Sequence, residues 1–318
     1  MSTDLVVSEH ALPDVPAFLS ELDVSPSTIH SYKKKMAAFR MWLYESNITE
    51  PKSTDIRAYK KHLAARGLSV SSINQYLSAI RAFFRWAEES GRYPDIARSV
   101  RGDRAPQGHA KDALSEDDMK KCLEISKTRV HKRTGNVIND PRSYAVMALL
   151  FGAGLRTVEV IRANRGSYTE KDGVKVLYVW GKGRKQEDDF VKLPPFVSDA
   201  LDAYLATRGD AIGNKDPLFV GERSNKGNRM STRAIQRIAV SVFERAGVRS
   251  ERITPHSCRH SCVTLLLNKK VDPRRVQEHV RHARFETTQI YARDLKKLDS
   301  PAADVLSEAL SSKNDTQR

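Results

Sequence analysis

The chain is short of cysteine, aromatic residues and acidic residues, and it contains no long apolar run. Its 318 residues include three cysteines, too few for a disulfide framework at this length, which indicates a reducing compartment. No apolar run approaches the length of a membrane span, and the acidic, interrupted N-terminus is unlike a signal peptide. These absences predict a cytoplasmic protein with no membrane partner.

Positive charge is what the chain has in excess. Lysine and arginine number 54 against 39 aspartate and glutamate residues, which gives a net charge of +15 and a pI of about 9.7. Such an excess favours a polyanionic partner, with nucleic acid as the first candidate. A basic protein without a specialised partner is the alternative that composition leaves open. With 40% hydrophobic residues, the chain can bury one large core or two ordinary ones.

Residues 1–97 are predicted to form a helical domain. Apolar residues spaced three and four apart follow Ser25-Pro26, as on one face of a helix: Ile29, Tyr32, Met36, Phe39 and Leu43. We expect Thr54 to cap a second helix, Ser71 or Ser72 to cap a third, and residues 15–22 to form a short one. The outward faces carry a basic set that is either solvated surface or a phosphate-facing surface: Lys33, Lys34, Lys35, Arg40, Lys60, Lys61, Arg66, Arg81 and Arg85.

Residues 98–111 have little periodicity and many charges, which is typical of a linker between domains. Residues 112–318 are predicted to form a second domain, mostly helical. Within it, residues 174–180 alternate as a strand does and residues 190–193 return beside it, which predicts a small antiparallel sheet. The basic stretch 127–142 is expected to be a DNA-facing loop. The predicted fold class is therefore mainly α with a small antiparallel β-sheet.

A helix start near residue 254 carries the first candidate site. Thr254-Pro255 combines a capping hydroxyl with proline at the first helical position. His256 then lies in the first turn, where free N–H groups favour an anion, and Arg259 follows on the same side. An arginine fork can hold two phosphate oxygens at once. The alternative is an ordinary capped helix with incidental polar residues.

The same stretch offers what looks like a metal site. His256, Cys258, His260 and Cys262 are spaced two apart. On a helix such residues point about 200° apart, so the four cannot converge on one ion. We therefore expect no metal here and expect the two cysteines to pack in the core.

Two further cations follow glycine-rich turns. Arg156 comes after Gly-Ala-Gly, and Glu159, three residues on, is placed to orient a neighbouring arginine. Lys182 lies between glycines in a turn from which a long amine can reach a phosphate, with Arg184 and Lys185 as alternatives. Each residue alone is more often ordinary surface.

Tyr291 lies nine residues after His282, on a helix expected to begin near residue 287. A lone helical tyrosine is usually a packing residue. A phenol is also a poor nucleophile at neutral pH, because its reference pKa is about 10. Nearby cations would favour the phenolate as the proton leaves.

Together these motifs resemble the tyrosine recombinase, or phage integrase, family over nearly the whole chain. The family's catalytic residues, which are Arg, Lys, His-x-x-Arg, His or Trp, and Tyr, match this sequence in order and spacing at Arg156, Lys182, His256 with Arg259, His282 and Tyr291. The resemblance implies a helical, SAM-like core-DNA-binding domain over residues 1–97 and a mixed α/β catalytic domain over 112–318.

The resemblance also implies a site-specific recombinase that cleaves and rejoins DNA. Tyr291 would attack a phosphodiester and form a 3′-phosphotyrosine, with Lys182 as general acid and His256 assisting proton transfer. Arg156, Arg259 and His282 would stabilise the transition state. Neither ATP nor any cofactor or metal is implied. The implied partner is double-stranded DNA with core sites, which would associate the protein with the nucleoid. The resemblance also implies a homo-tetramer on two duplexes and, optionally, an accessory directionality factor.

Some features depart from the family pattern or leave alternatives open. Val280-Arg281-His282 has arginine where the family often has glycine, so Arg281 either adds a phosphate contact or disturbs the turn. No arm-binding domain is expected in front of residue 1. A C-terminal helix over 302–310 is expected to dock in cis or in trans. A type IB topoisomerase and a non-catalytic DNA-binding regulator are the alternative functions.

Overall fold

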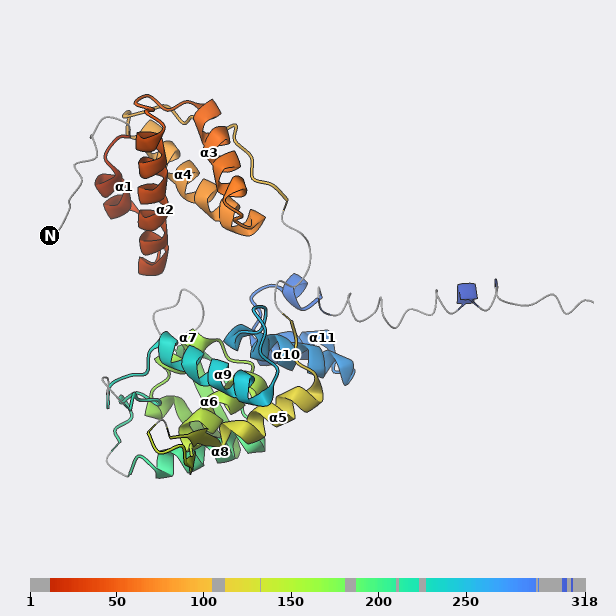
Figure 1. Cartoon of the computed structure of the whole chain (residues 1–318). Coiled ribbons are helices and arrows are strands. Elements are labelled where there is room, and N and C mark those ends of the chain that lie inside the picture. The colour runs from red at the N-terminus through yellow and green to blue at the C-terminus, as the bar shows by residue number, and fades with distance from the viewer. Residues whose placement is uncertain are drawn as a thin grey trace, which may run out of the picture. The chain divides into compact units, whose positions relative to one another are not determined.

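The computed structural model describes residues 12–104, 112–131, 133–180, 187–209, 212–222, 227–289, 291, 305–307 and 310. The chain divides into two compact units, residues 1–107 and 108–318, and the break lies inside the predicted linker 98–111 (Figure 1). Both units are mainly helical, which confirms the predicted fold class. Among the described residues, no helix is long and apolar enough to cross a membrane.

The N-terminal unit is a bundle of helices around an aromatic core (Figure 1). Its helices are α1 (Val15–Glu21), α2 (Pro26–Glu45), α3 (Ser53–Ala65) and α4 (Val70–Glu89). Of the apolar positions predicted from the periodicity of α2, Met36, Phe39 and Leu43 are fully buried, whereas Ile29 and Tyr32 near its start are half-buried. The helices predicted in this unit are therefore confirmed, and the three-and-four spacing correctly indicated the core face.

Two of the predicted helix caps were wrong. Helix α3 begins at Ser53 with Lys52 as its N-cap, two residues before the expected cap Thr54, because the Asp55 carboxylate reaches back to accept from the Lys52 backbone N–H at 2.7 Å. Helix α4 begins after Ser69, whose hydroxyl accepts from the backbone N–H of Ser72 at 3.2 Å. In both cases a competing polar side chain nearby satisfies the free N–H groups of the first turn.

Part of the predicted phosphate-facing surface of this unit is occupied by the unit's own chain. Residues 95–103 pack back against α3 and α4, and Val100 is only 3% exposed. The Arg81 Nε donates to the Val100 carbonyl at 3.0 Å, and Lys60 pairs with Asp103 at 2.5 Å. These two cations therefore fasten the first part of the predicted linker to the bundle, which is a structural role.

The C-terminal unit surrounds a buried helix, α6 (Pro141–Gly152), whose residues 145–151 are at most 1% exposed. Helices α5 (Glu116–Ser126), α8 (Pro195–Ala206), α9 (Thr232–Ala246) and α10 (Pro255–Asn268) pack against it. The short helix α7 (Thr157–Arg162) follows it directly, and α11 (Pro273–Val280) packs on α10. Residues 285–289 are helical, as are 305–307 and 310. Whether the C-terminal helix docks in cis or in trans stays a prediction.

The sheets are small and antiparallel. Strand β4 (Val174–Trp180) is confirmed, and it pairs with β5 (Glu187–Lys192) and with β3 (Tyr168–Lys171), which the sequence interpretation missed. Asp172 and Gly173 both have positive φ, as a two-residue turn between β3 and β4 requires. A second hairpin, β1 (Thr128–Val130) with β2 (Val137–Asn139), lies where only a loop was expected.

Candidate active site

A tight turn after α6 brings the candidate site together. The backbone of Gly154 is left-handed, with φ of 56°, and a Cβ there would lie 2.8 Å from Val280 Cγ1. Only glycine fits this position without strain and without pushing α11 away. The turn places Arg156 at the N-terminus of α7, so α7, α10 and the end of α11 meet at this point.

Arg259 joins these segments from α10. Its side chain is buried, and its two terminal nitrogens donate to the carbonyl of Gly154, at 2.5 Å, and to the carbonyl of Val280. Burial lowers the pKa of Arg259 to about 9, and the neighbouring Arg156 charge acts in the same direction. The guanidinium still carries its charge at pH 7. Because a guanidinium has five N–H groups, these two bonds fix its plane and leave donors for a phosphate.

Arg156 and Arg281 share one buried carboxylate. Glu159 Oε1 accepts from Arg156 Nη1 at 2.7 Å, and Glu159 Oε2 accepts from the Arg156 backbone N–H at 2.8 Å and from Arg281 Nη2 at 3.0 Å. Burial alone would raise the pKa of Glu159, but Arg281 and then Arg156 outweigh it and lower that pKa. The carboxylate is therefore ionised. It holds Arg156 in a fixed orientation, as its position three residues on predicted.

His282 follows α11 and is 9% exposed. Its Nδ1 lies 2.8 Å from the hydroxyl of the buried Thr288. Burial is the largest cause that lowers the pKa of His282, to about 3, and Arg259 and Arg156 act in the same direction. The ring is therefore neutral at pH 7. The charge of His256, which is exposed in the first turn of α10, also lowers this pKa.

Tyr291 lies against two histidine rings and is 8% exposed. Its ring centroid is 4.5 Å from that of His260 and 6.4 Å from that of His282. Burial raises the pKa of Tyr291, and the opposing effect of the Arg259 charge does not overcome it. The phenol is therefore protonated at neutral pH, so the expected assistance from cations does not prevail in this arrangement. A base must accept its proton if it is to act as a nucleophile.

The structure brings together most of the predicted set. Arg156, Arg259, His282 and Tyr291 lie around the point where α7, α10 and the end of α11 meet, and His256 is exposed in the first turn of α10. Lys182, with its alternatives Arg184 and Lys185, lies outside the described residues, between β4 and β5 in the sequence.

The sequence interpretation missed several residues around this set. It assigned no role to His260 against the tyrosine ring or to Thr288 beside His282. A helical position one turn after His256 was the only signal for His260. Thr288 had no signal beyond lying on the expected helix of Tyr291.

The cysteines of α10 face different parts of the core. Cys258 is buried with α5 and α6, whereas Cys262 is buried with Val276 and Val280. Burial raises the pKa of the Cys262 thiol to about 12. The prediction that both cysteines pack in the core is confirmed.

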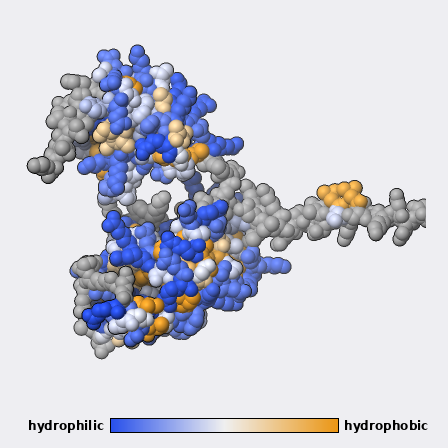
Figure 2. All heavy atoms as spheres, viewed as in Figure 1, coloured by the Kyte–Doolittle hydropathy of each residue, from blue (hydrophilic) through white to orange (hydrophobic). Residues whose placement is uncertain are grey.

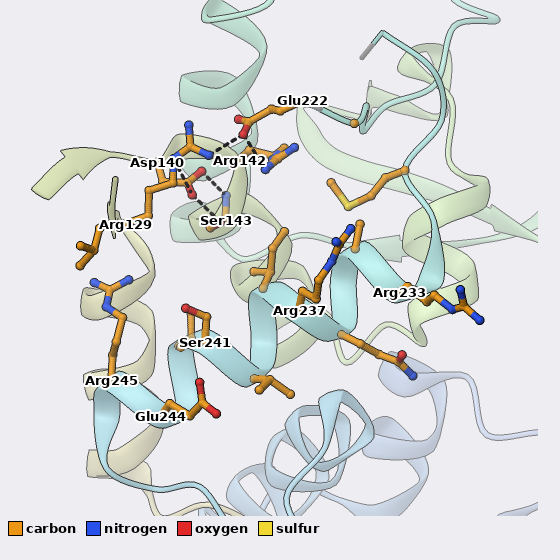
Figure 3. Close-up of a pocket in the computed structure, with 18 of the residues that line it drawn as sticks. Arg129, Asp140, Arg142, Ser143, Glu222, Arg233, Arg237, Ser241, Glu244 and Arg245 are labelled. Atoms are coloured by element: carbon orange, nitrogen blue, oxygen red, sulfur yellow. Dashed lines mark hydrogen bonds and ion pairs between the residues drawn. The ribbon is translucent and has the colours of Figure 1, made fainter. Parts of the chain in front are cut away.

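A second basic cluster lines a groove on the same unit, and Arg156, Arg259, His282 and Tyr291 are not among the residues that line it. Strand β1, the start of α6 and one face of α9 line this groove, whose volume is about 1280 Å³ (Figure 3). Glu222 binds Arg129 at 2.5 Å and Arg142 at 3.1 Å, and Arg245 Nη1 donates to the Thr128 carbonyl at 2.6 Å. Figure 3 shows two further groove arginines on α9, and both are exposed: Arg233 and Arg237.

In the face shown in Figure 2, hydrophilic side chains dominate the surface of each unit.

Comparison with known proteins finds matches over most of the chain. Residues 112–297 match the phage integrase family, and residues 17–91 match the phage integrase N-terminal SAM-like domain. Tyrosine recombinase XerC of Serratia marcescens is 33% identical over 292 residues, covering 87% of this chain and 88% of that protein. Tyrosine recombinase XerA of Thermococcus kodakarensis is 30% identical over 270 residues, covering 85% of each.

Solved structures share the fold. XerH site-specific recombinase bound to palindromic difH substrate, in a post-cleavage complex, matches with a TM-score of 0.68 at 20% identity, over 89% of this chain and 79% of that one. A lambda integrase dimer bound to a COC′ core site matches with a TM-score of 0.65 at 16% identity, over 87% of this chain and 92% of that one.

Proposed function

Because the chain belongs to the phage integrase family, we propose that it is a tyrosine-type site-specific recombinase that cleaves and rejoins DNA through a covalent 3′-phosphotyrosine. The observation that carries this proposal is the meeting of Tyr291 with Arg259 and His282, all of them buried, in one site. Relatives named as tyrosine recombinases that align over most of both chains support it.

In the proposed reaction, the Tyr291 oxygen attacks a backbone phosphorus and the bond from phosphorus to the 5′-oxygen breaks. His256 assists removal of the phenolic proton, and Lys182 gives a proton to the departing 5′-oxygen. The new ester bond between phosphorus and the Tyr291 oxygen conserves the free energy of the broken phosphodiester, so the 5′-hydroxyl can later attack it and the cycle consumes no nucleotide.

The cations stabilise the charge that grows on the phosphorus in the transition state. Arg259 and Arg156 are held rigidly, by backbone carbonyls and by Glu159 respectively, so neither needs to reorganise as the charge develops. His282 is neutral. If its Nδ1 accepts from Thr288, its other ring nitrogen carries the hydrogen and donates to a phosphate oxygen.

The proposed partner is double-stranded DNA. The groove beside α9 supplies exposed arginines on a rigid helix, which suits contact with a duplex backbone. We propose that residues 1–97 and 112–318 act as two domains that hold one half-site, and that four copies assemble on two duplexes. An accessory directionality factor is a further proposed partner.

A nicked suicide substrate tests the proposal. Duplex sites are first selected by binding from a random library, and then nicked so that cleavage releases a short fragment and religation fails. Wild-type protein should form an adduct that survives denaturing electrophoresis, whereas Tyr291→Phe should bind the same DNA and form none.

Two outcomes would contradict this. An adduct formed by Tyr291→Phe would remove the nucleophile assignment, and specific binding without any wild-type adduct would indicate a DNA-binding regulator. Joining of two distinct duplexes separates a recombinase from a topoisomerase, which would only relax supercoiled DNA.

A further inference from the structure

Arg281 occupies a backbone position that disfavours its own side chain. It follows the last residue of α11 with φ of 55° and ψ of 55°, the left-handed conformation in which a helix usually ends on glycine. An arginine costs more free energy than glycine in this conformation, and contacts made by its side chain can offset that cost.

Those contacts are long-range and buried. The side chain of Arg281 is 7% exposed and that of Glu159 is 4% exposed, and their atoms Nη2 and Oε2 are 3.0 Å apart. A second terminal nitrogen of Arg281 donates to the His279 carbonyl at 3.1 Å. The guanidinium therefore connects the end of α11 to the start of α7, 122 positions away in the sequence.

Both ends of this connection carry residues of the proposed cleavage centre. His282 directly follows Arg281, and its backbone N–H is bonded to the Gln277 carbonyl at 3.1 Å, so its place depends on how α11 ends. At the other end, the Glu159 carboxylate accepts from both the backbone N–H and the side chain of Arg156. A shift of Arg281 would therefore move a residue at each end.

The charge of Arg281 matters as well. Glu159 would otherwise face Arg156 alone and would neutralise most of its charge. With Arg281 present, the same carboxylate is shared, and Arg156, Arg259 and Arg281 together outnumber it by two positive charges. That surplus favours a bound phosphate over an internal ion pair.

We propose that Arg281 is a positioning residue for DNA cleavage, an inference that rests on the proposed function. Through its bond to Glu159, Arg281 fixes the positions of Arg156 and His282. It does not itself bind the phosphate in this arrangement, because its two terminal nitrogens donate to Glu159 and to the backbone of α11 and its Nε is buried.

The test is single-turnover cleavage of the suicide substrate by Arg281→Gly. Glycine adopts the left-handed backbone conformation without strain, so we expect this variant to fold. We expect the cleavage rate at saturating DNA to fall about 10-fold or more, since displaced catalytic groups lose rate steeply. The Kd for DNA should change by no more than about twofold, because a loss confined to the rate indicates a transition-state effect.

Three further variants make the test specific. Lys270→Gly is the matched control, since Lys270 also has positive φ, at 59°, but its side chain is exposed. It should cleave as wild type does. Arg281→Lys should restore part of the rate. Adding Arg281→Gly to Glu159→Gln should slow cleavage no further than Glu159→Gln alone, because both remove the same link.

The proposal is overturned if Arg281→Gly cleaves at the wild-type rate, if Lys270→Gly loses as much, or if the effects of the Glu159 and Arg281 changes add. Failure of the proposed function looks different, because the wild-type protein would then form no covalent adduct at all.

Discussion

The tyrosine site and the α9 groove, two basic clusters of one unit, differ in how their arginines are held. In the site, Arg259 and Arg156 are tied to backbone carbonyls and a buried carboxylate, and each has few orientations. In the groove, Arg233 and Arg237 are exposed on α9. Fixed charges suit a transition state, whereas exposed, solvated charges suit attraction to a polyanion.

Arg259→Lys should have the largest effect. Lysine keeps one charge but cannot donate to both carbonyls and a phosphate in one plane. We expect single-turnover cleavage to fall about 10²- to 10³-fold, the loss typical of a removed transition-state donor. DNA binding by this variant should stay close to that of wild type. Rapid-quench assays on the suicide substrate measure the rate, and unimpaired cleavage would contradict the assignment of Arg259 to the site.

Changing Arg233 and Arg237 together to alanine should affect DNA binding and not the cleavage rate. Removing two phosphate contacts should weaken binding and reduce the slope of log K against log salt by about 0.9 per contact. Cleavage at saturating DNA should be nearly unchanged. Fluorescence anisotropy at several salt concentrations measures this, with Arg249→Ala as the control, since Arg249 is exposed beyond the end of α9 and pairs with Glu244. An unchanged slope would mean that the groove does not contact DNA.

The smallest expected effect concerns the dependence of stability on pH. The folded pKa of His282 is lowered to about 3, mainly by burial, from an ordinary value of 6.5. The unfolded chain therefore binds more protons at this residue below pH 6.5, so its contribution to stability is lost as the pH falls towards 3. Between pH 7 and pH 5, wild type should lose more unfolding free energy than His282→Gln. Urea denaturation at both pH values measures this, and equal losses would contradict the burial of a neutral imidazole.

Local sequence signals predicted much of the frame of the site. Thr254-Pro255 marked the start of α10 and so placed His256 and Arg259 on it. The Gly-Ala-Gly sequence predicted a tight turn, because glycine readily adopts the left-handed backbone that such a turn needs, and Arg156 directly after the turn was therefore expected at the start of the next element. Both signals arise from residues that are adjacent in the sequence, so they can be recognised without knowing the tertiary structure.

What the sequence did not predict depends on contacts between distant residues. No pattern indicates that Arg281 reaches Glu159 rather than a phosphate, or that Lys60 pairs with Asp103 and not with DNA. The β1–β2 hairpin was missed for another reason. Its three-residue strands are too short to show alternation, although the glycine at position 135 marks its turn.

The most direct test of the central claim is to identify the residue that becomes attached to DNA. Wild-type protein is trapped on the nicked duplex, both components are digested, and the cross-linked peptide is sequenced by mass spectrometry. We expect a nucleotide attached through its 3′-phosphate to the oxygen of Tyr291. A nucleotide on any other side chain, or one attached through its 5′-phosphate, would contradict it.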